Sequence, residues 1–429
     1  MLSSFFIRNF RSILELKLDF SYGEGKAPNG YKGLEIMPFI EEADRQRVVP
    51  CMAFFGANAS GKTNILKAIG ALRLLLLGEG ALPGVYEPNL LNPMFSDTTF
   101  ELEFLIGRDR FQYRIVYNAT EILAESLLKD GEPLYSIQRL KAEYSPLILS
   151  STYSEQKLSE ILRVECSGGE GRQTKPFLQR IGLGYPGLSQ DLKNAFLYFR
   201  GGLTYYSNEQ PILLPFSVEI LASTLEGDQK AALREITDVV RRLDIDIAAI
   251  DIVQRELTPN DNTLGVGITK FDHGTGVRHA VQITATHKAV GGDLTVLDFI
   301  KHESAGTQRL AGLVGLTLYT LKTGGVLFVD ELECSLHPLL MREIVMLFKK
   351  RRFNPKGAQL IFNTHNTDIL DDSILRLSEI ALVRKTLANG TIVRRLVYSK
   401  DDGADIRNVT NFRKQYLAGF YSGIPHPVP

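Results

Sequence analysis

The chain has 429 residues, of which 44% are apolar and 23% are charged, close to the usage of an ordinary globular protein. Its 49 basic and 49 acidic side chains cancel, which excludes the strong overall positive field that many nucleic-acid-binding proteins use, although a local basic patch stays open. This composition excludes a disordered, collagen-like or disulfide-rich protein, and the length suffices for a large α/β core with an insertion.

Cysteine usage and hydropathy point to the cytoplasm. The three cysteines, Cys51, Cys166 and Cys334, are widely spaced and form no metal-ligand pattern, so we expect reduced thiols. Charged residues interrupt segment 1–20, which therefore does not resemble a signal peptide. The most apolar run, residues 74–77, is far shorter than the roughly 20 residues that a membrane-spanning helix needs. We expect a cytoplasmic protein that does not cross a membrane.

The first hundred residues predict strands that lead into a helix. Alternating apolar and polar residues predict two strands within 1–19, and an apolar run predicts another over 48–55. A loop rich in Gly, Pro and Asn over 21–33 separates them. Apolar residues at helical spacing over 61–77, followed by Gly78, predict a helix that begins soon after the last of these strands.

The rest of the chain divides by pattern. Alternation between 98 and 136 predicts an antiparallel sheet, which would form a second lobe of the same domain. Helical patterns without a sustained heptad repeat then predict an inserted helical region over 144–247. We therefore expect an N-terminal part of the core over 1–143, the insert over 144–247, and a C-terminal part of the core over 248–429.

A phosphate-binding loop follows the strand over 48–55. The sequence Gly-Ala-Asn-Ala-Ser-Gly-Lys-Thr begins at Gly56 and fits the pattern G-x-x-x-x-G-K-[ST]. Backbone N–H groups of such a loop surround phosphates, its lysine reaches the β- and γ-phosphates, and the next hydroxyl holds Mg²⁺. The alternative is a fortuitous Gly-rich turn, which the flanking strand and helix disfavour. We predict that ATP contacts Gly56, Asn58, Ser60, Gly61, Lys62, Thr63 and Asn64, and that Thr63 also binds Mg²⁺.

Two carboxylates end a later apolar strand. Residues 325–329 lead into Asp330 and Glu331. Such a pair is often plain solvated surface, but together with a phosphate-binding loop it fits a Walker B element. We predict that Asp330 helps to hold Mg²⁺ and that Glu331 accepts the proton of the attacking water or orients that water.

A third motif precedes this strand. Residues 303–307 read Glu-Ser-Ala-Gly-Thr and lead into a helical pattern over 310–321. They resemble the signature motif of ABC-type ATPases, whose serine, glycine and helix N-terminus bind the γ-phosphate held by the opposite subunit. Thr307 stands where transporters have a second glycine, and an ordinary helix N-cap is the alternative. We predict that Ser304 and Gly306 bind nucleotide.

The order of the later motifs distinguishes between classes of P-loop ATPase. Residues 334–338 stand where a D-loop belongs, and the strand over 359–363 ends at Thr364 and His365. A histidine that closes a strand is more often structural, but this succession predicts a switch histidine that contacts the γ-phosphate and the water. Lys62 and Asp330 are 268 positions apart, whereas hexameric AAA+ motors place these motifs within about one βαβ repeat. An ABC-type core is expected.

With these residues, the chain resembles the RecF/OLD-like ABC-type ATPases of bacterial antiphage and abortive-infection systems. The opening strand over 6–12 and the tail over 416–425 also resemble that family. The resemblance implies a two-lobed α/β fold, an ABC-type P-loop NTPase core with an antiparallel β lobe and an inserted helical region. It also implies that two chains join head to tail around ATP and Mg²⁺, as a homodimer or a higher even-numbered oligomer.

Alternative functions follow from this resemblance. One is an ATPase sensor or scaffold that controls a separate toxic effector, such as a nuclease, in antiphage defence. Another is a DNA-repair ATPase of the RecF kind that binds DNA. Neutral charge and the lack of long helical arms favour the first, and the degenerate signature disfavours a transporter subunit. Only 64 residues follow His365, without a carboxylate cluster suited to two metals, so we expect nuclease activity to reside in another protein.

Overall fold

The computed structural model describes residues 1–22, 36–37, 40–41, 47–91, 93–168, 171–185, 187–207, 213–243, 246–256, 268–271, 278–371, 373–396 and 412–418. Most of the loop expected over 21–33 and most of the tail over 416–425 lie outside these residues. The chain forms two compact units. The first comprises Met1–Ser207, Thr323–Leu332 and Val345–Pro429, and the second comprises Asn208–Lys322 and Glu333–Ile344.

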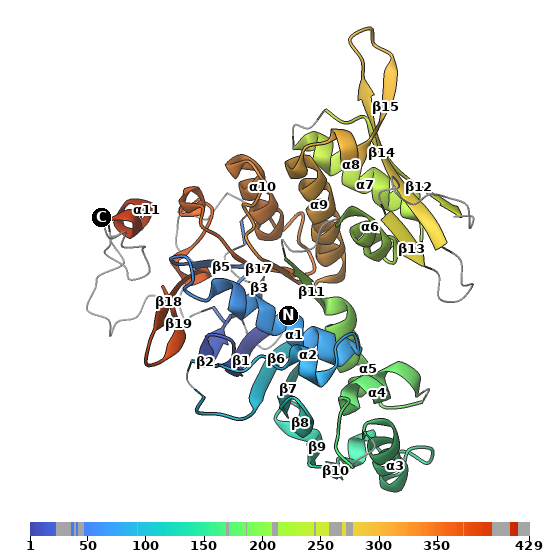
Figure 1. Cartoon of the computed structure of the whole chain (residues 1–429), viewed down its shortest axis with the longest axis vertical. Helices are drawn as coiled ribbons and strands as arrows, with labels where there is room; N and C mark the ends of the chain where they lie inside the picture. Colours follow the sequence, from blue (N-terminus) through green and yellow to red (C-terminus); the bar gives the residue numbers. More distant parts are fainter. Residues whose placement is uncertain are drawn as a thin grey trace. The chain divides into compact units, whose positions relative to one another are not determined.

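A large mixed sheet forms the first unit (Figure 1). Its strands are β1 (Leu2–Phe10), β2 (Ile13–Asp19), β5 (Cys51–Phe55), β6 (Thr98–Ile106), β7 (Asp109–Tyr117), β8 (Ile122–Lys129), β9 (Glu132–Gln138), β10 (Lys141–Tyr144), β11 (Leu203–Tyr206), β16 (Val326–Val329), β17 (Gln359–Asn363), β18 (Ile380–Thr386) and β19 (Gly390–Arg395). They lie in the order β10-β9-β8-β7-β6-β1-β2-β19-β18-β5-β17-β16-β11.

The sheet has a parallel part and an antiparallel part. Strands β18, β5, β17, β16 and β11 run parallel, and every residue of β5 and β17 is buried, as expected for parallel strands covered on both faces. Strands β6 to β10 pair antiparallel with their neighbours. The structure is thus α/β, with a parallel core and an antiparallel β lobe, which confirms the predicted fold class.

Helices cover this sheet. They are α1 (Lys62–Leu77), α2 (Leu82–Val85), α3 (Glu155–Glu165), α4 (Phe177–Gly184), α5 (Gln190–Leu197) and α11 (Phe412–Leu417), with short turns η2 (Pro146–Ile148), η3 (Tyr198–Gly202), η4 (Thr367–Ile369) and η5 (Leu377–Glu379). A small separate sheet pairs β3 (Ile40–Glu41) with β4 (Arg47–Val48). The apolar face of α1 is buried as its spacing predicts, and Gly78 ends the helix with a φ of 74°.

The second unit combines helices with a smaller antiparallel sheet. Its elements are α6 (Leu214–Ala222), α7 (Gln229–Arg242), β12 (Ala249–Glu256), β13 (Ile268–Phe271), β14 (Arg278–Lys288), β15 (Leu294–Asp298), α8 (Phe299–His302) and α9 (Ala305–Thr323), whose last residue belongs to the first unit. Strand β14 pairs with β12, β13 and β15, and its long hairpin with β15 stands out in Figure 1. Helix α10 (Pro338–Lys349) begins in the second unit and ends in the first.

The region expected as a helical insert is shared between the units. Helices α3, α4 and α5 belong to the first unit, and α6 and α7 to the second. Strand β11 lies within the same stretch and pairs parallel with β16 of the large sheet. The predicted boundaries at 143 and 247 remain a prediction. In the described parts of both units, no helix is long and apolar enough to cross a membrane.

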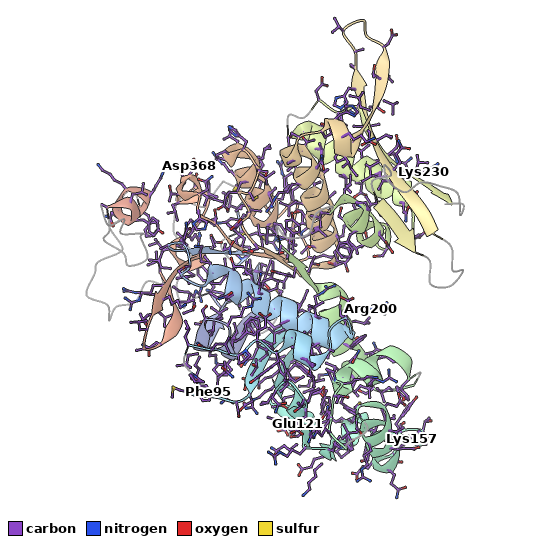
Figure 2. The ribbon with its side chains drawn as sticks, viewed as in Figure 1. Phe95, Glu121, Lys157, Arg200, Lys230 and Asp368 are labelled. Atoms are coloured by element: carbon purple, nitrogen blue, oxygen red, sulfur yellow. The ribbon has the colours of Figure 1, made fainter. Side chains whose placement is uncertain are left out.

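A buried carboxylate joins α4 to the antiparallel lobe. Glu125 on β8 is 1% exposed and accepts hydrogen bonds from the hydroxyls of Tyr113 (3.2 Å) and Tyr135 (3.0 Å). The backbone N–H groups of Phe177 (2.7 Å) and Leu178 (2.9 Å), in the first turn of α4, also donate to it. Burial raises the pKa of Glu125 above its usual value, and these hydrogen bonds offset part of the rise. The carboxylate therefore caps α4. Glu121, just before β8, and Lys157, on α3, mark this end of the unit in Figure 2.

We expect Glu125→Leu to destabilise the first unit by about 3–5 kcal/mol, because buried donors lose their acceptor while the side-chain volume is nearly kept. Glu125→Gln keeps one oxygen and should cost roughly half as much. Denaturant unfolding of the purified chain measures both effects. The matched control is Glu132→Leu, because Glu132 is exposed on the neighbouring strand β9. Equal stability of the Glu125→Leu and Glu132→Leu variants would contradict the capping role.

Candidate functional site

Three of the predicted motifs meet at one edge of the large sheet. Strand β5 leads into Gly56, β16 leads into Asp330 and Glu331, and β17 leads into Thr364 and His365. Strand β17 lies between β5 and β16, and all three run parallel. Their carboxyl ends therefore share an edge, which is where open α/β sheets bind ligands.

The loop between β5 and α1 turns through a residue that must be glycine. Gly61 has a φ of 103°, and a Cβ at this position would lie 2.0 Å from Thr391 Oγ1. Only glycine combines this backbone conformation with so little space. Gly56 is buried at the start of the loop, and Asn58 is exposed at its tip.

Lys62 lies across the loop. The residue is only 5% exposed, and its Nζ donates to the carbonyl oxygens of Gly56 (2.8 Å) and Ala57 (3.0 Å). The ammonium group is thus held within the curve of the loop, at the N-terminus of α1, where an anion is favoured.

Side chains from distant segments support this loop. The hydroxyls of Ser12 and Thr391 are 2.7 Å apart, and Thr391 Oγ1 donates to the carbonyl oxygen of Ser60 (3.2 Å). Asn64 Nδ2 donates to Ser12 Oγ (2.7 Å). The Ser60 hydroxyl is buried and has no hydrogen-bond partner among the described residues. The β1–β2 turn and β19 therefore fix the loop from one side.

Thr63, Asp330 and Asn363 form a contact group beside the loop. Thr63 Oγ1 donates to Asp330 Oδ1 (3.1 Å), and Asn363 Nδ2 donates to the same oxygen (2.5 Å). Burial raises the pKa of Asp330 above its usual value, and the hydrogen bonds from Asn363 and Thr63 offset part of the rise. A hydroxyl and a carboxylate are thereby joined at the ends of α1 and β16.

Glu331 and His365 follow two members of this group, Asp330 and Asn363, closely in the chain. The backbone N–H of Glu331 donates to Asn363 Oδ1, so one amide side chain contacts both residues of the acidic pair. Glu331 has a φ of 50°, in the left-handed region. His365 is exposed two residues beyond the end of β17.

The signature residues lie in the second unit. Ser304 is exposed at the N-terminus of α9, and its Oγ accepts from the N–H of Thr307 (3.1 Å). A Cβ at Gly306 would lie 2.4 Å from the carbonyl oxygen of Ser335, in the D-loop. The first turn of α9 therefore packs on the D-loop backbone, and a larger residue at 306 would separate them.

Comparison with known families identifies the class. The sequence model of the family described as "AAA domain, putative AbiEii toxin, Type IV TA system" matches residues 51–371, about three quarters of the chain. The chain belongs to this family. Membership confirms the predicted resemblance to P-loop ATPases of abortive-infection type, and the matched span begins at β5 and includes all predicted site residues.

Solved structures show distant likeness to this AAA-domain protein. The SMC head bound to the C-winged helix domain of ScpA is 13% identical, with a TM-score of 0.44 over 93% of this chain and 98% of that chain. The SMC head domain from Thermotoga maritima is 14% identical, with a TM-score of 0.40 over 92% of this chain and 99% of that chain. A comparison with curated proteins finds no match.

The donor set of this AAA domain fits a nucleotide with Mg²⁺. Thr63 and Asp330 offer the hard oxygen ligands that Mg²⁺ prefers. The loop offers backbone N–H groups, the Lys62 ammonium and the unpaired Ser60 hydroxyl, which are donors suited to phosphate oxygens. The glycine-only position at 61 lets the backbone approach closely. Nothing in the donor set conflicts with ATP.

Sequence reasoning did not assign three residues that contact the candidate site. Asn363 was seen only as the end of a strand, yet it contacts both Asp330 and Glu331. A polar residue that closes an otherwise apolar strand is a usable signal for such a role. Ser12 and Thr391 hold the loop from segments 379 positions apart. Ser12 closes the segment 6–12 that resembles the family, but its contact with the loop has no local signal, and no local pattern marks Thr391.

Proposed function

We propose that this chain hydrolyses ATP at a site that two subunits form together, and that the ATP cycle controls a separate effector protein. The contact group of Thr63, Asp330 and Asn363 is the observation that supports the proposal most directly. P-loop ATPases hold Mg²⁺ through the loop hydroxyl and the Walker B aspartate, and here these two oxygens lie 3.1 Å apart.

Each residue then has a distinct task. Lys62 would exchange its two loop carbonyls for phosphate oxygens, and the loop N–H groups would hold the remaining charge. Mg²⁺ held by Thr63 and Asp330 would neutralise charge on the β and γ oxygens. Glu331 would take the proton of the water that attacks the γ-phosphorus, releasing ADP and phosphate. His365 would contact the γ-phosphate and this water.

A second chain would complete the site. Ser304 directly precedes α9, a helix of 19 residues, and Gly306 lies in its first turn. The N-terminus of a helix favours an anion through its dipole. One chain supplies one phosphate-binding loop and one signature segment, so two chains placed head to tail would form two equivalent sites. A homodimer or a higher even-numbered oligomer satisfies this arrangement.

Mixed subunits test the composite site. Lys62→Ala and Ser304→Arg chains should each lack ATPase activity alone, because the first has no working loop and the second has no working signature. When mixed, each heterodimer should recover one intact site, so ATPase activity should reappear. Phosphate release from equimolar mixtures measures it, and native mass spectrometry verifies mixing. Mixed but inactive heterodimers would show that the signature does not act on a partner's nucleotide.

The effector part of the proposal goes beyond the family description, which names a putative AbiEii toxin of a Type IV TA system and no separate effector. It draws instead on the resemblance to abortive-infection ATPases that regulate a separate nuclease. We expect the purified chain with ATP and Mg²⁺ or Mn²⁺ to hydrolyse ATP and to leave DNA and RNA intact. Cleavage that persists in a Glu331→Gln variant after rigorous purification would overturn the regulator role. ATP hydrolysis that DNA strongly stimulates would instead favour the RecF-like repair function.

A further inference from the structure

The signature segment follows a strand hairpin with almost no intervening chain. Strand β15 ends at Asp298, whose side chain accepts from the N–H of Lys301 (2.9 Å) and caps the short helix α8. Only Glu303 and Ser304 separate α8 from α9. The position of Ser304 is therefore set by whatever holds Glu303.

A histidine on the hairpin holds the side chain of Glu303. His287, on β14 opposite Thr295 of β15, places its Nε2 2.6 Å from Glu303 Oε1. The Glu303 side chain is 11% exposed and that of His287 is 26% exposed. A partly buried hydrogen bond between these groups is stronger than one in open solvent, because water competes less for either partner.

A glutamine holds the backbone of the same residue. Gln308 Nε2 donates to the carbonyl oxygens of Glu303 (2.9 Å) and Ile300 (2.9 Å). Its own backbone N–H donates to the carbonyl oxygen of Ser304 (3.0 Å). Glu303 is thus fixed at its side chain by β14 and at its carbonyl by α9, which leaves little freedom for Ser304.

We infer that His287 is a positioning residue for the signature serine. Through Glu303 it holds Ser304 Oγ and the N-terminus of α9 in one orientation. In that orientation they would bind the γ-phosphate of the nucleotide in the partner subunit's loop. The inference rests on the proposed function, since it requires Ser304 to act on a partner's nucleotide. A displacement of about 1 Å in a group that contacts the reacting phosphate can cost on the order of 100-fold in rate, so a side chain outside the site can matter.

The complementing pair of chains gives a test that separates positioning from folding. In that pair the Lys62→Ala chain supplies the working signature, and the Ser304→Arg chain supplies the working loop. Adding His287→Ala to the Lys62→Ala chain should lower the recovered ATPase rate roughly tenfold, because the working signature loses its support. Adding His287→Ala to the Ser304→Arg chain should leave the rate unchanged, because that signature is already inactive.

Further variants make the result specific. His287→Gln keeps an N–H donor and should restore most of the rate on the Lys62→Ala chain, and Gln308→Leu should lower that rate as His287→Ala does. Lys288→Ala, at the exposed next residue, is the matched control and should have no effect. Equal losses with His287→Ala on either chain would show a folding defect and overturn the inference, as would no loss on the Lys62→Ala chain. Failure of the starting pair to regain activity would instead refute the composite site.

Discussion

Lys62→Ala is expected to abolish ATP binding, with a loss of at least about 100-fold in affinity, or roughly 3 kcal/mol. The Lys62 ammonium is buried in the curve of the loop and already rests on two carbonyl oxygens, at 2.8 Å and 3.0 Å. Under the proposed role, phosphate oxygens would replace those carbonyls. Alanine leaves the backbone N–H groups, the Ser60 hydroxyl and Mg²⁺ to balance the β and γ charges, and removes the one cationic side chain of the loop.

Titration of the purified chain with a fluorescent ATP analogue in the presence of Mg²⁺ measures this loss. Lys17→Ala is the control, because Lys17 is an exposed cation on β2 of the same unit. Thermal unfolding should give similar midpoints for both variants, so that lost binding is not lost folding. Undiminished affinity in the Lys62→Ala chain would remove the loop assignment.

Glu331→Gln should separate binding from turnover. Glutamine keeps the shape of the side chain, and the backbone N–H that Glu331 donates to Asn363 is untouched. Thr63 and Asp330 also keep their contact. ATP should therefore bind normally, while the rate of hydrolysis falls by roughly 100- to 10,000-fold because the proton acceptor is gone. The ATP-bound assembly should persist as a consequence.

Single-turnover phosphate release and size-exclusion chromatography with ATP measure these two outcomes. Glu343→Gln, at an exposed position on α10, controls for the loss of an acidic charge. Turnover at the wild-type rate in Glu331→Gln would exclude this residue as the base. Loss of ATP binding would show instead that Glu331 contributes to the ground-state complex.

Local patterns predicted much of the fold. The helical spacing after Gly61 gave α1, because its apolar face packs on the sheet and the loop glycine starts it. The strand predicted over 359–363, which is apolar at residues 360–362, forms β17 within the same bounds, and all five of its residues are buried. In both cases a short stretch of sequence carries the physical cause. The same is true of the phosphate-binding loop, whose chemistry lies in eight consecutive residues.

The remaining features depend on contacts that are distant in sequence. The pairing of β11 with β16, which adds a strand from the expected helical insert to the large sheet, has no local signal. The alternating pattern of its strand does not distinguish Glu125 from other polar residues, although the backbone N–H groups of residues 177 and 178 donate to it. The polar end of β17 could have marked Asn363 as a candidate, but its two partners, Asp330 and Glu331, become evident only when β16 and β17 are paired.

Glu331, the proposed catalytic base, has a backbone conformation that costs stability. A φ of 50° costs a residue with a Cβ of the order of 1 kcal/mol more than it costs glycine. Selection for a durable fold alone would therefore favour glycine or asparagine directly after β16. A glutamate at this position is explained if selection acted on activity and not on stability. The protein then loses a little stability at the position that we propose as its catalytic base, as expected when an active site and its scaffold have conflicting needs.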